Sequence, residues 1–203
     1  APSLNELDKN SEANNQALKD KIEESIKEAQ SLKKDIAALN KELLEKPNLN
    51  WQEKKKLEDL LNKQKNLEQK VDQIKNDNKQ NNQEQSDYKQ ESQEILDKQQ
   101  QLEKLFNEVM TDEMKDLYKQ LEEMLEKLDK NKIQEQLEKI NLSNEDIKKE
   151  LDRSLELFKQ LEFEQKMTET IDKLKKLSED QEKLSVETKQ NKVPNEELKK
   201  KQD

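Results

Sequence analysis

The sequence predicts an all-α protein built from long amphipathic helices, and three observations lead to this prediction. The 203 residues include no glycine, whereas an average chain of this length has about fourteen, so few positions require a tight turn. Charged residues make up 43% of the chain, and the abundant Leu, Lys, Glu and Gln are strong helix formers. Apolar residues recur at heptad spacing over most of the length, which is typical of coiled coils.

The apolar content limits the kind of core that these helices can form. Hydrophobic residues make up only 29% of the chain, against about half in an ordinary globular domain. This is enough for a thin seam between a few helices. We therefore expect an elongated antiparallel coiled coil of helical hairpins, and the alternative is a three- or four-helix bundle bent at Thr111 and Asp129. In either case residues 1–203 form a single elongated helical region.

The first helix is expected at about residues 3–46. Its seam is mostly apolar from Leu18 onward and mostly polar before it. Pro47 ends the helix because proline lacks a backbone donor and its ring clashes with the preceding turn.

The second helix is expected at about residues 51–110. Asn50 is its N-cap, and Glu53 stands three residues later, as in a capping box. The heptad spacing then continues without a slip to Val109. The polar seam residues Asn78, Asn81 and Gln85 allow two interpretations. They could fix the register of a coiled coil, or they could mark a loosely packed zone.

Two further helices complete the chain. A phase shift follows Val109, and Thr111 caps a helix over about 112–140 with a break near 129–132. Ser143 is the next N-cap, supported by a hydrophobic staple between Leu142 and Ile147. The helix that it opens runs over about 144–190, and residues 191–203 form a flexible tail.

Two sharp reversals would place these helices side by side. Reversal at Pro47 brings the polar seam residues Ser11 and Asn15 beside Gln85 and Asn81, with Asp8 and Tyr88 in the same polar zone. Reversal at residues 141–143 would bring three further pairs together: Leu128 with Leu155, Phe106 with Leu177, and Ile95 with Thr188.

The residues expected to carry the structure fall into three groups. The turn and cap residues are Pro47, Asn50, Thr111 and Ser143. The aromatic side chains expected as packing anchors are Trp51, Phe106, Tyr118, Phe158 and Phe163. The seam residues are Leu18, Ile22, Leu32, Ile36, Leu39, Leu43, Leu57, Leu60, Leu67, Val71, Ile74, Leu102, Phe106, Leu117, Leu121, Leu151, Leu155, Phe158, Ile171 and Leu174.

Composition also limits the chemistry of the chain. It has no histidine and no cysteine, which supply most catalytic bases, nucleophiles and transition-metal ligands. We therefore expect neither an enzyme nor a cofactor or metal site. The net charge of −9 disfavours nucleic-acid binding. No apolar run approaches the roughly 20 residues that cross a bilayer, so we expect no membrane insertion by this segment. We expect protein partners, and a monomer or weak homodimer.

Three stretches carry a family resemblance: LNWQEKKKLEDLLNKQKNLEQ (49–69), MTDEMKDLYKQLEEMLEKLDKNKI (110–133) and LSNEDIKKELDRSLELFKQLEFEQKM (142–167). Together they resemble the coiled-coil region of a large uncharacterised family of membrane-anchored Bacteroidota envelope proteins. The resemblance implies that the chain is a piece of a larger protein and that it faces the periplasm. The alternative location is the cytoplasm. The family offers no established activity.

Two functions are consistent with these features. The first is a non-catalytic structural or docking coiled-coil rod of a larger cell-envelope protein. The alternative is a holdase-like chaperone, in which helical arms clamp client chains.

Overall fold

The computed structural model describes residues 4–46, 48–88, 91–127 and 129–189, and these are almost entirely helical. The all-α fold class is confirmed. Pro47 and the expected tail at 191–203 lie outside the described residues. The described helices are α1 (Leu4–Glu45), α2 (Trp51–Tyr88), α3 (Gln93–Val109), α4 (Asp112–Lys127) and α5 (Lys130–Lys189).

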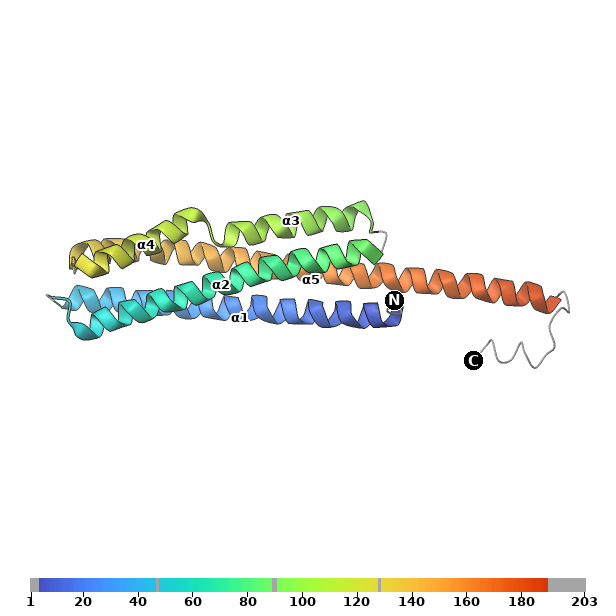
Figure 1. Ribbon diagram of the computed structural model, residues 1–203, viewed down its shortest axis with the longest axis horizontal. Helices are drawn as coiled ribbons and strands as arrows, with labels where there is room; N and C mark the ends of the chain where they lie inside the picture. Colours follow the sequence, from blue (N-terminus) through green and yellow to red (C-terminus); the bar gives the residue numbers. More distant parts are fainter. Residues whose placement is uncertain (1–3, 47, 89–90, 128, 190–203) are drawn as a thin grey trace. The chain divides into compact units, whose positions relative to one another are not determined.

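The chain divides into two units, Ala1–Leu161 and Glu162–Asp203, whereas the sequence predicts a single region. In the first unit, α1 and α2 lie side by side, and α3 and α4 follow one another along α2 (Figure 1). The start of α5 contacts both α4 and α1, through Gln136 with the Leu117 carbonyl and through Lys33 with Glu145. The unit is therefore a four-rod antiparallel bundle, in which α3 and α4 form one bent rod. This arrangement matches the expected alternative of a bent bundle.

One continuous apolar core holds the first unit together. It begins at Leu18 in α1 and includes buried side chains from all five helices, the last being Leu161 in α5. Heptad spacing aligns these side chains along one face of each helix. The 42 residues of α1 correspond to a length of about 63 Å at 1.5 Å per residue.

The predicted pairing of α1 with α2 is confirmed. Asn81 Nδ2 donates to Asn15 Oδ1 at 2.5 Å, and Gln85 Nε2 donates to Ser11 Oγ at 3.1 Å. Nearer the turn, Lys63 pairs with Asp35 at 2.6 Å. The side chains of Asp8 and Tyr88 lie outside the described residues.

The capping box at the start of α2 is also confirmed. Asn50 Oδ1 accepts from the backbone N–H groups of Gln52 and Glu53, and Glu53 Oε2 accepts from the Asn50 N–H at 2.9 Å. Three backbone N–H groups at the start of the helix are thereby satisfied.

The expected single helix over 51–110 is interrupted. α2 ends at Tyr88 and α3 begins at Gln93, with Ser92 Oγ accepting from the Ile95 N–H at 3.4 Å. The heptad phase is the same on both sides, so periodicity alone could not reveal this break. The predicted Thr111 cap is confirmed, because Thr111 Oγ1 accepts from the Met114 N–H at 3.3 Å.

The predicted reversal at residues 141–143 is wrong. α5 is continuous from Lys130, so Ser143 lies in a helix interior rather than at an N-cap. The chain reverses before α5, where Asp129 Oδ1 accepts from the Lys132 N–H at 3.3 Å. Of the pairs expected from the wrong reversal, Leu128 lies outside the described residues, and Leu177 and Thr188 are exposed.

The predicted seam holds in the first unit with two exceptions. Leu117 and Leu155 are only half-buried. The seam residues that are buried are Leu18, Ile22, Leu32, Ile36, Leu39, Leu43, Leu57, Leu60, Leu67, Val71, Ile74, Leu102, Phe106, Leu121, Leu151 and Phe158.

The seam prediction is wrong at Ile171 and Leu174, which are 43% and 60% exposed. Both belong to the second unit, whose described part is a single stretch of helix. A lone helix has no neighbour in its own unit to cover an apolar face. The expected anchors Trp51 and Phe163 are also exposed, and Lys55 lies over the Trp51 ring, 5.4 Å from its centre.

Candidate functional site

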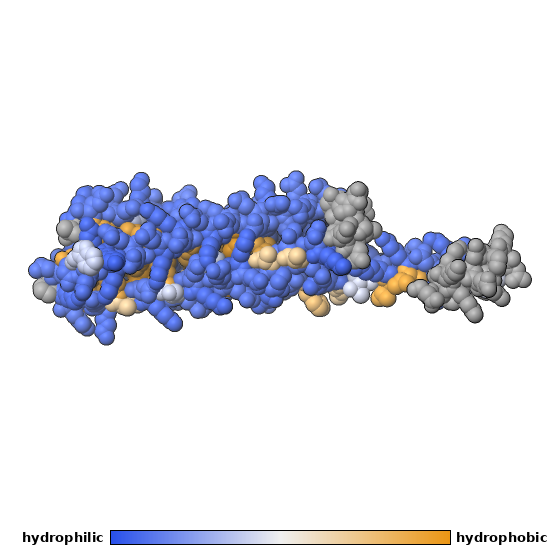
Figure 2. Space-filling view, turned by 60° about the horizontal axis from the view of Figure 1, so that its bottom comes forward, coloured by the Kyte–Doolittle hydropathy of each residue, from blue (hydrophilic) through white to orange (hydrophobic). Residues whose placement is uncertain are grey.

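The polar groups of the bundle fall into a few clusters, each with a structural role that its geometry explains. On the face shown in Figure 2, hydrophilic side chains cover most of the surface. Among the described residues, no group of three or more acidic side chains could hold a metal ion. None of the described helices combines the length and the apolar character needed to span a bilayer.

An ion-pair cluster closes the end of the bundle at the α1–α2 turn. Lys46 pairs with Glu42 at 2.8 Å and with Glu53, whose side chain is fully buried. Lys56 of α2 pairs with Glu42 of α1 at 2.5 Å. Lys130 donates to the Lys46 carbonyl, which links the start of α5 to the same turn. The cluster therefore connects three helices.

The electrostatics of this cluster favour its charged form. Hydrogen bonds from Lys46 and then Lys56 lower the pKa of Glu42 to about 2. The Lys46 hydrogen bond also lowers the pKa of Glu53, and the two carboxylates in turn raise the pKa of Lys46. These carboxylates stay ionised at neutral pH and cannot act as general acids there.

The polar layer between α1 and α2 is packed rather than open. Asn15 and Asn81 are each 6% exposed and bond to one another, and Gln85 bonds to Ser11. Asn78 is also buried, and its Oδ1 has no hydrogen-bond partner. Of the two interpretations of these residues, the geometry favours a register device, because a shift of one helix would leave the paired amides unsatisfied.

Two buried amides fix α5 against α4. Gln136 Nε2 donates to the Leu117 carbonyl at 2.8 Å, and Asn144 Nδ2 donates to Tyr118 Oη at 2.6 Å. Burial raises the pKa of the Tyr118 hydroxyl, although the hydrogen bond from Asn144 acts in the opposite direction. Sequence reasoning missed this pair because it placed Asn144 in the first turn of a helix rather than in a seam.

A groove lies between α1 and α2. It is lined by Ala38, Leu39 and Leu60 and bordered by the Asp35–Lys63 and Glu42–Lys56 ion pairs. These four charged side chains are already paired across the groove, so they offer little to a charged ligand.

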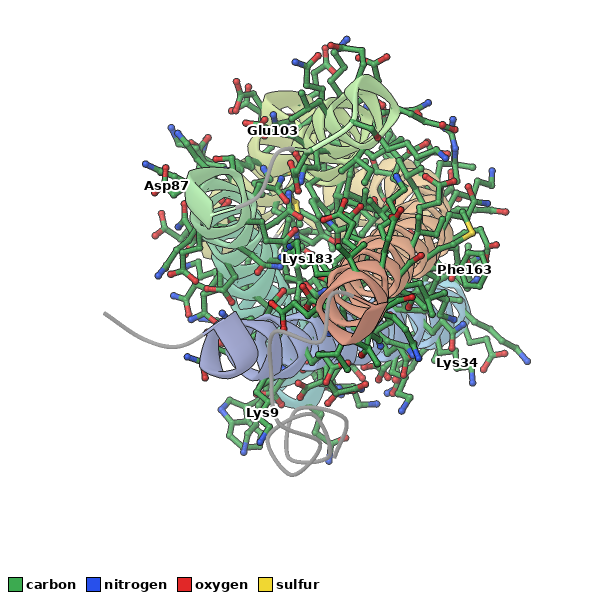
Figure 3. All side chains as sticks on the ribbon, turned by 90° about the vertical axis from the view of Figure 1, so that its right-hand side faces the viewer. Lys9, Lys34, Asp87, Glu103, Phe163 and Lys183 are labelled. Atoms are coloured by element: carbon green, nitrogen blue, oxygen red, sulfur yellow. The ribbon has the colours of Figure 1, made fainter. Side chains whose placement is uncertain are left out.

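The second unit presents a different surface. Its helix carries five exposed large apolar side chains on one face: Phe163, Met167, Ile171, Leu174 and Leu177. We call this set the apolar stripe. Phe163 and Lys183 project from α5 on opposite sides (Figure 3). Exposed apolar side chains arranged as a continuous stripe, rather than scattered singly, are typical of an interaction surface.

Comparisons with protein-family models, with curated proteins and with solved structures find no match for this chain.

Proposed function

We propose that this chain is a non-catalytic structural and docking rod of a larger cell-envelope protein, facing the periplasm. The observation that carries the proposal is the single continuous core that joins all five helices in the first unit. Such a core makes each helix depend on its neighbours, so the bundle resists bending and keeps its two ends at a fixed separation.

The distribution of charge supports the same role. Ion pairs join neighbouring helices along the bundle, for example Lys70 with Glu24 and Lys115 with Glu68. Ion pairing lowers the pKa of Glu42, Glu53 and Glu145, whereas a carboxyl that acts as a general acid near neutral pH needs a raised pKa. The envelope location rests on the family resemblance of residues 49–69, 110–133 and 142–167.

Cell fractionation with crosslinking in the native organism tests this proposal. We expect the chain in the envelope fraction, protected from protease in intact cells that retain their outer membrane and cleaved once that membrane is permeabilised. Crosslinks to a few defined envelope proteins are expected on the bundle surface. Recovery of the chain from the cytosolic fraction, or turnover of a small molecule by the purified chain, would contradict it.

A second candidate is a holdase-like chaperone, and the apolar stripe favours it because exposed apolar side chains can bind unfolded clients. The test is suppression of client aggregation by the full chain and by a variant carrying Leu174→Glu and Leu177→Glu. Val186→Glu is the matched control, since Val186 is an exposed apolar residue on the same helix outside the stripe. The holdase function is supported if the wild type and Val186→Glu suppress aggregation and the stripe variant does not. It is excluded if the wild type does not suppress aggregation at several-fold molar excess.

A further inference from the structure

The helix of the second unit has its own heptad pattern. Starting at Phe163, positions alternate by four and three residues. The six central positions are Met167, Thr170, Leu174, Leu177, Gln181 and Leu184. Phe163, Leu174 and Leu177 are each at least 60% exposed. A two-stranded coiled coil requires this spacing of apolar side chains on one helix face.

This pattern does not continue the seam of the bundle. The bundle seam of α5 includes Leu151, Phe158 and Leu161, and the same spacing would next select the polar residues Gln165 and Thr168. The new pattern begins two residues out of phase, which moves the apolar face about 200° around the helix. The stripe is therefore a surface distinct from the bundle seam. An isolated helix is marginally stable in water without tertiary packing.

We infer that the stripe pairs with the same stripe of a second copy of this chain, with the two helices antiparallel. In the best register, Leu174 of one copy faces Leu177 of the other, and Met167 faces Leu184. Thr170 faces Gln181, so the polar layer also meets a polar layer. Over these six central positions apolar residues thus face apolar ones and polar residues face polar ones, while Phe163 at the end of the stripe faces Thr188.

Charge complementarity selects this orientation and register. One flank of the stripe is formed by the residues that directly precede Met167, Leu174, Gln181 and Thr188. In order, these residues are Lys166, Lys173, Asp180 and Glu187. When the second helix is reversed, Lys173 lies beside Asp180 of the other copy, and Lys166 lies beside Glu187. Each pair occurs twice by symmetry, so the dimer has four complementary contacts on its flanks.

The competing arrangements lack this complementarity. A shift by one heptad in one direction places Lys173 beside Lys173 of the other copy. A shift in the opposite direction places Asp180 beside Asp180 of the other copy, so both shifts bring like charges together. A parallel pair places Lys166 beside Ile171 and Lys173 beside Ser178, so neither lysine meets an acid. Because flanking charges determine partner orientation in coiled coils, the antiparallel pair is favoured.

Contacts within the helix are compatible with this pairing. Lys166 lies 3.4 Å from Glu162 and Lys183 lies 3.5 Å from Asp180. The Lys183–Asp180 pair is exposed, and in the Lys166–Glu162 pair the lysine is exposed while Glu162 is half-buried. Pairs within one helix that are open to solvent contribute little. A lysine ammonium has three donors, so Lys166 can keep Glu162 and still reach Glu187 of the other copy. The inference is independent of the proposed function, since it requires only the helix and its sequence.

Sedimentation equilibrium of the full chain over a range of concentrations tests the dimer. We expect a reversible monomer–dimer equilibrium. Leu174→Glu with Leu177→Glu should leave only monomer, and the control Val186→Glu should remain dimeric. Wild-type chain that is monomeric at every concentration, or a stripe variant that dimerises as well as the wild type, would overturn the inference.

Charge reversal tests the register. Lys173→Glu alone and Asp180→Lys alone should each weaken the dimer about tenfold, because two attractive contacts become repulsive. The combined variant should recover the wild-type dissociation constant. If the combined variant is as weak as the two single variants, the Lys173–Asp180 register is wrong.

Spin labels test the orientation. The chain has no cysteine, so Val186→Cys gives one label per copy on the face away from the partner. Antiparallel pairing places the two labels about 30 Å apart along the axis, whereas a parallel pair places them at the same level. A short label-to-label distance in the dimer would overturn the antiparallel arrangement.

Discussion

Ser143→Ala tests where the chain makes its second reversal. If Ser143 capped a helix, its loss would cost about 1 kcal/mol. In the structure Ser143 lies inside α5, where alanine is the better helix former by a few tenths of a kcal/mol. The two arrangements therefore predict opposite signs, separated by about 1.4 kcal/mol, or roughly a factor of ten in the unfolding equilibrium.

Thr111→Ala is the matched control, because Thr111 is an N-cap in the structure. It should lower the free energy of unfolding by about 1 kcal/mol, and Asp129→Ala should also destabilise. The assay is urea unfolding followed by circular dichroism, with the slope of the transition compared between variants. A loss of about 1 kcal/mol in Ser143→Ala at unchanged slope would refute a continuous α5. Slow hydrogen exchange at the amides of residues 144–147 would support it independently, because the first four N–H groups of a helix lack intrahelical acceptors.

Three further predictions concern the polar groups of the bundle. Tyr118→Phe should lower the free energy of unfolding by about 1–2 kcal/mol, measured by urea unfolding, because it leaves the buried Asn144 amide without its acceptor. An unchanged free energy of unfolding in Tyr118→Phe would contradict this role of the hydroxyl. Asn81→Leu alone should lower the thermal midpoint, because it leaves the buried Asn15 amide without its partner. Asn81→Leu combined with Asn15→Leu should recover or exceed the wild-type midpoint. Equal midpoints in the single and the double variant would contradict this. The pKa of Glu42 is lowered to about 2 in the folded state, so its stabilising contribution is complete above the unfolded value near 4.5 and is lost as pH falls toward 2. Urea unfolding at several pH values should show that the free energy of unfolding falls less with acid in Lys46→Met than in the wild type. An equal fall in both proteins would count against the cluster.

The first hairpin could be predicted from sequence because two independent signals agree there. Asn50 and Glu53 place the start of α2 locally, and the polar seams of α1 and α2 align when the chain reverses at that point. Local capping and long-range pairing both determine the fold, so a position supported by both is well specified.

The second reversal was misplaced because a strong local signal competed with a longer one. Ser143 with a staple from Leu142 to Ile147 has the composition of a helix start. However, buried positions continue at heptad spacing through Ile140, Asn144 and Ile147. Burial of a continuous face contributes more free energy than one cap. The sequence does contain the correct cap, Asp129, immediately before the periodic residues of α5.

The break between α2 and α3 had no periodic signal at all. The seam keeps its phase from Gln85 to Ile95, and no proline or glycine stands between them. The only local indication is Ser92, which caps α3. A serine at a seam position can be a cap or an ordinary interior residue, as the buried Ser25 and Ser154 show. Only the three-dimensional arrangement distinguishes these cases.

The change of heptad phase after Leu161 explains why the chain forms two units although α5 has no break. Up to Leu161 the apolar face of α5 packs into the bundle core. Beyond it, the apolar residues lie on another face, and the residues in the old phase are polar. The heptad phase that builds the bundle core therefore does not continue into the second unit. Because helices of this composition require packing for stability, the order of the second unit depends on its own partner. Helix content in Glu162–Lys189 should consequently rise with chain concentration, while that of the bundle should not.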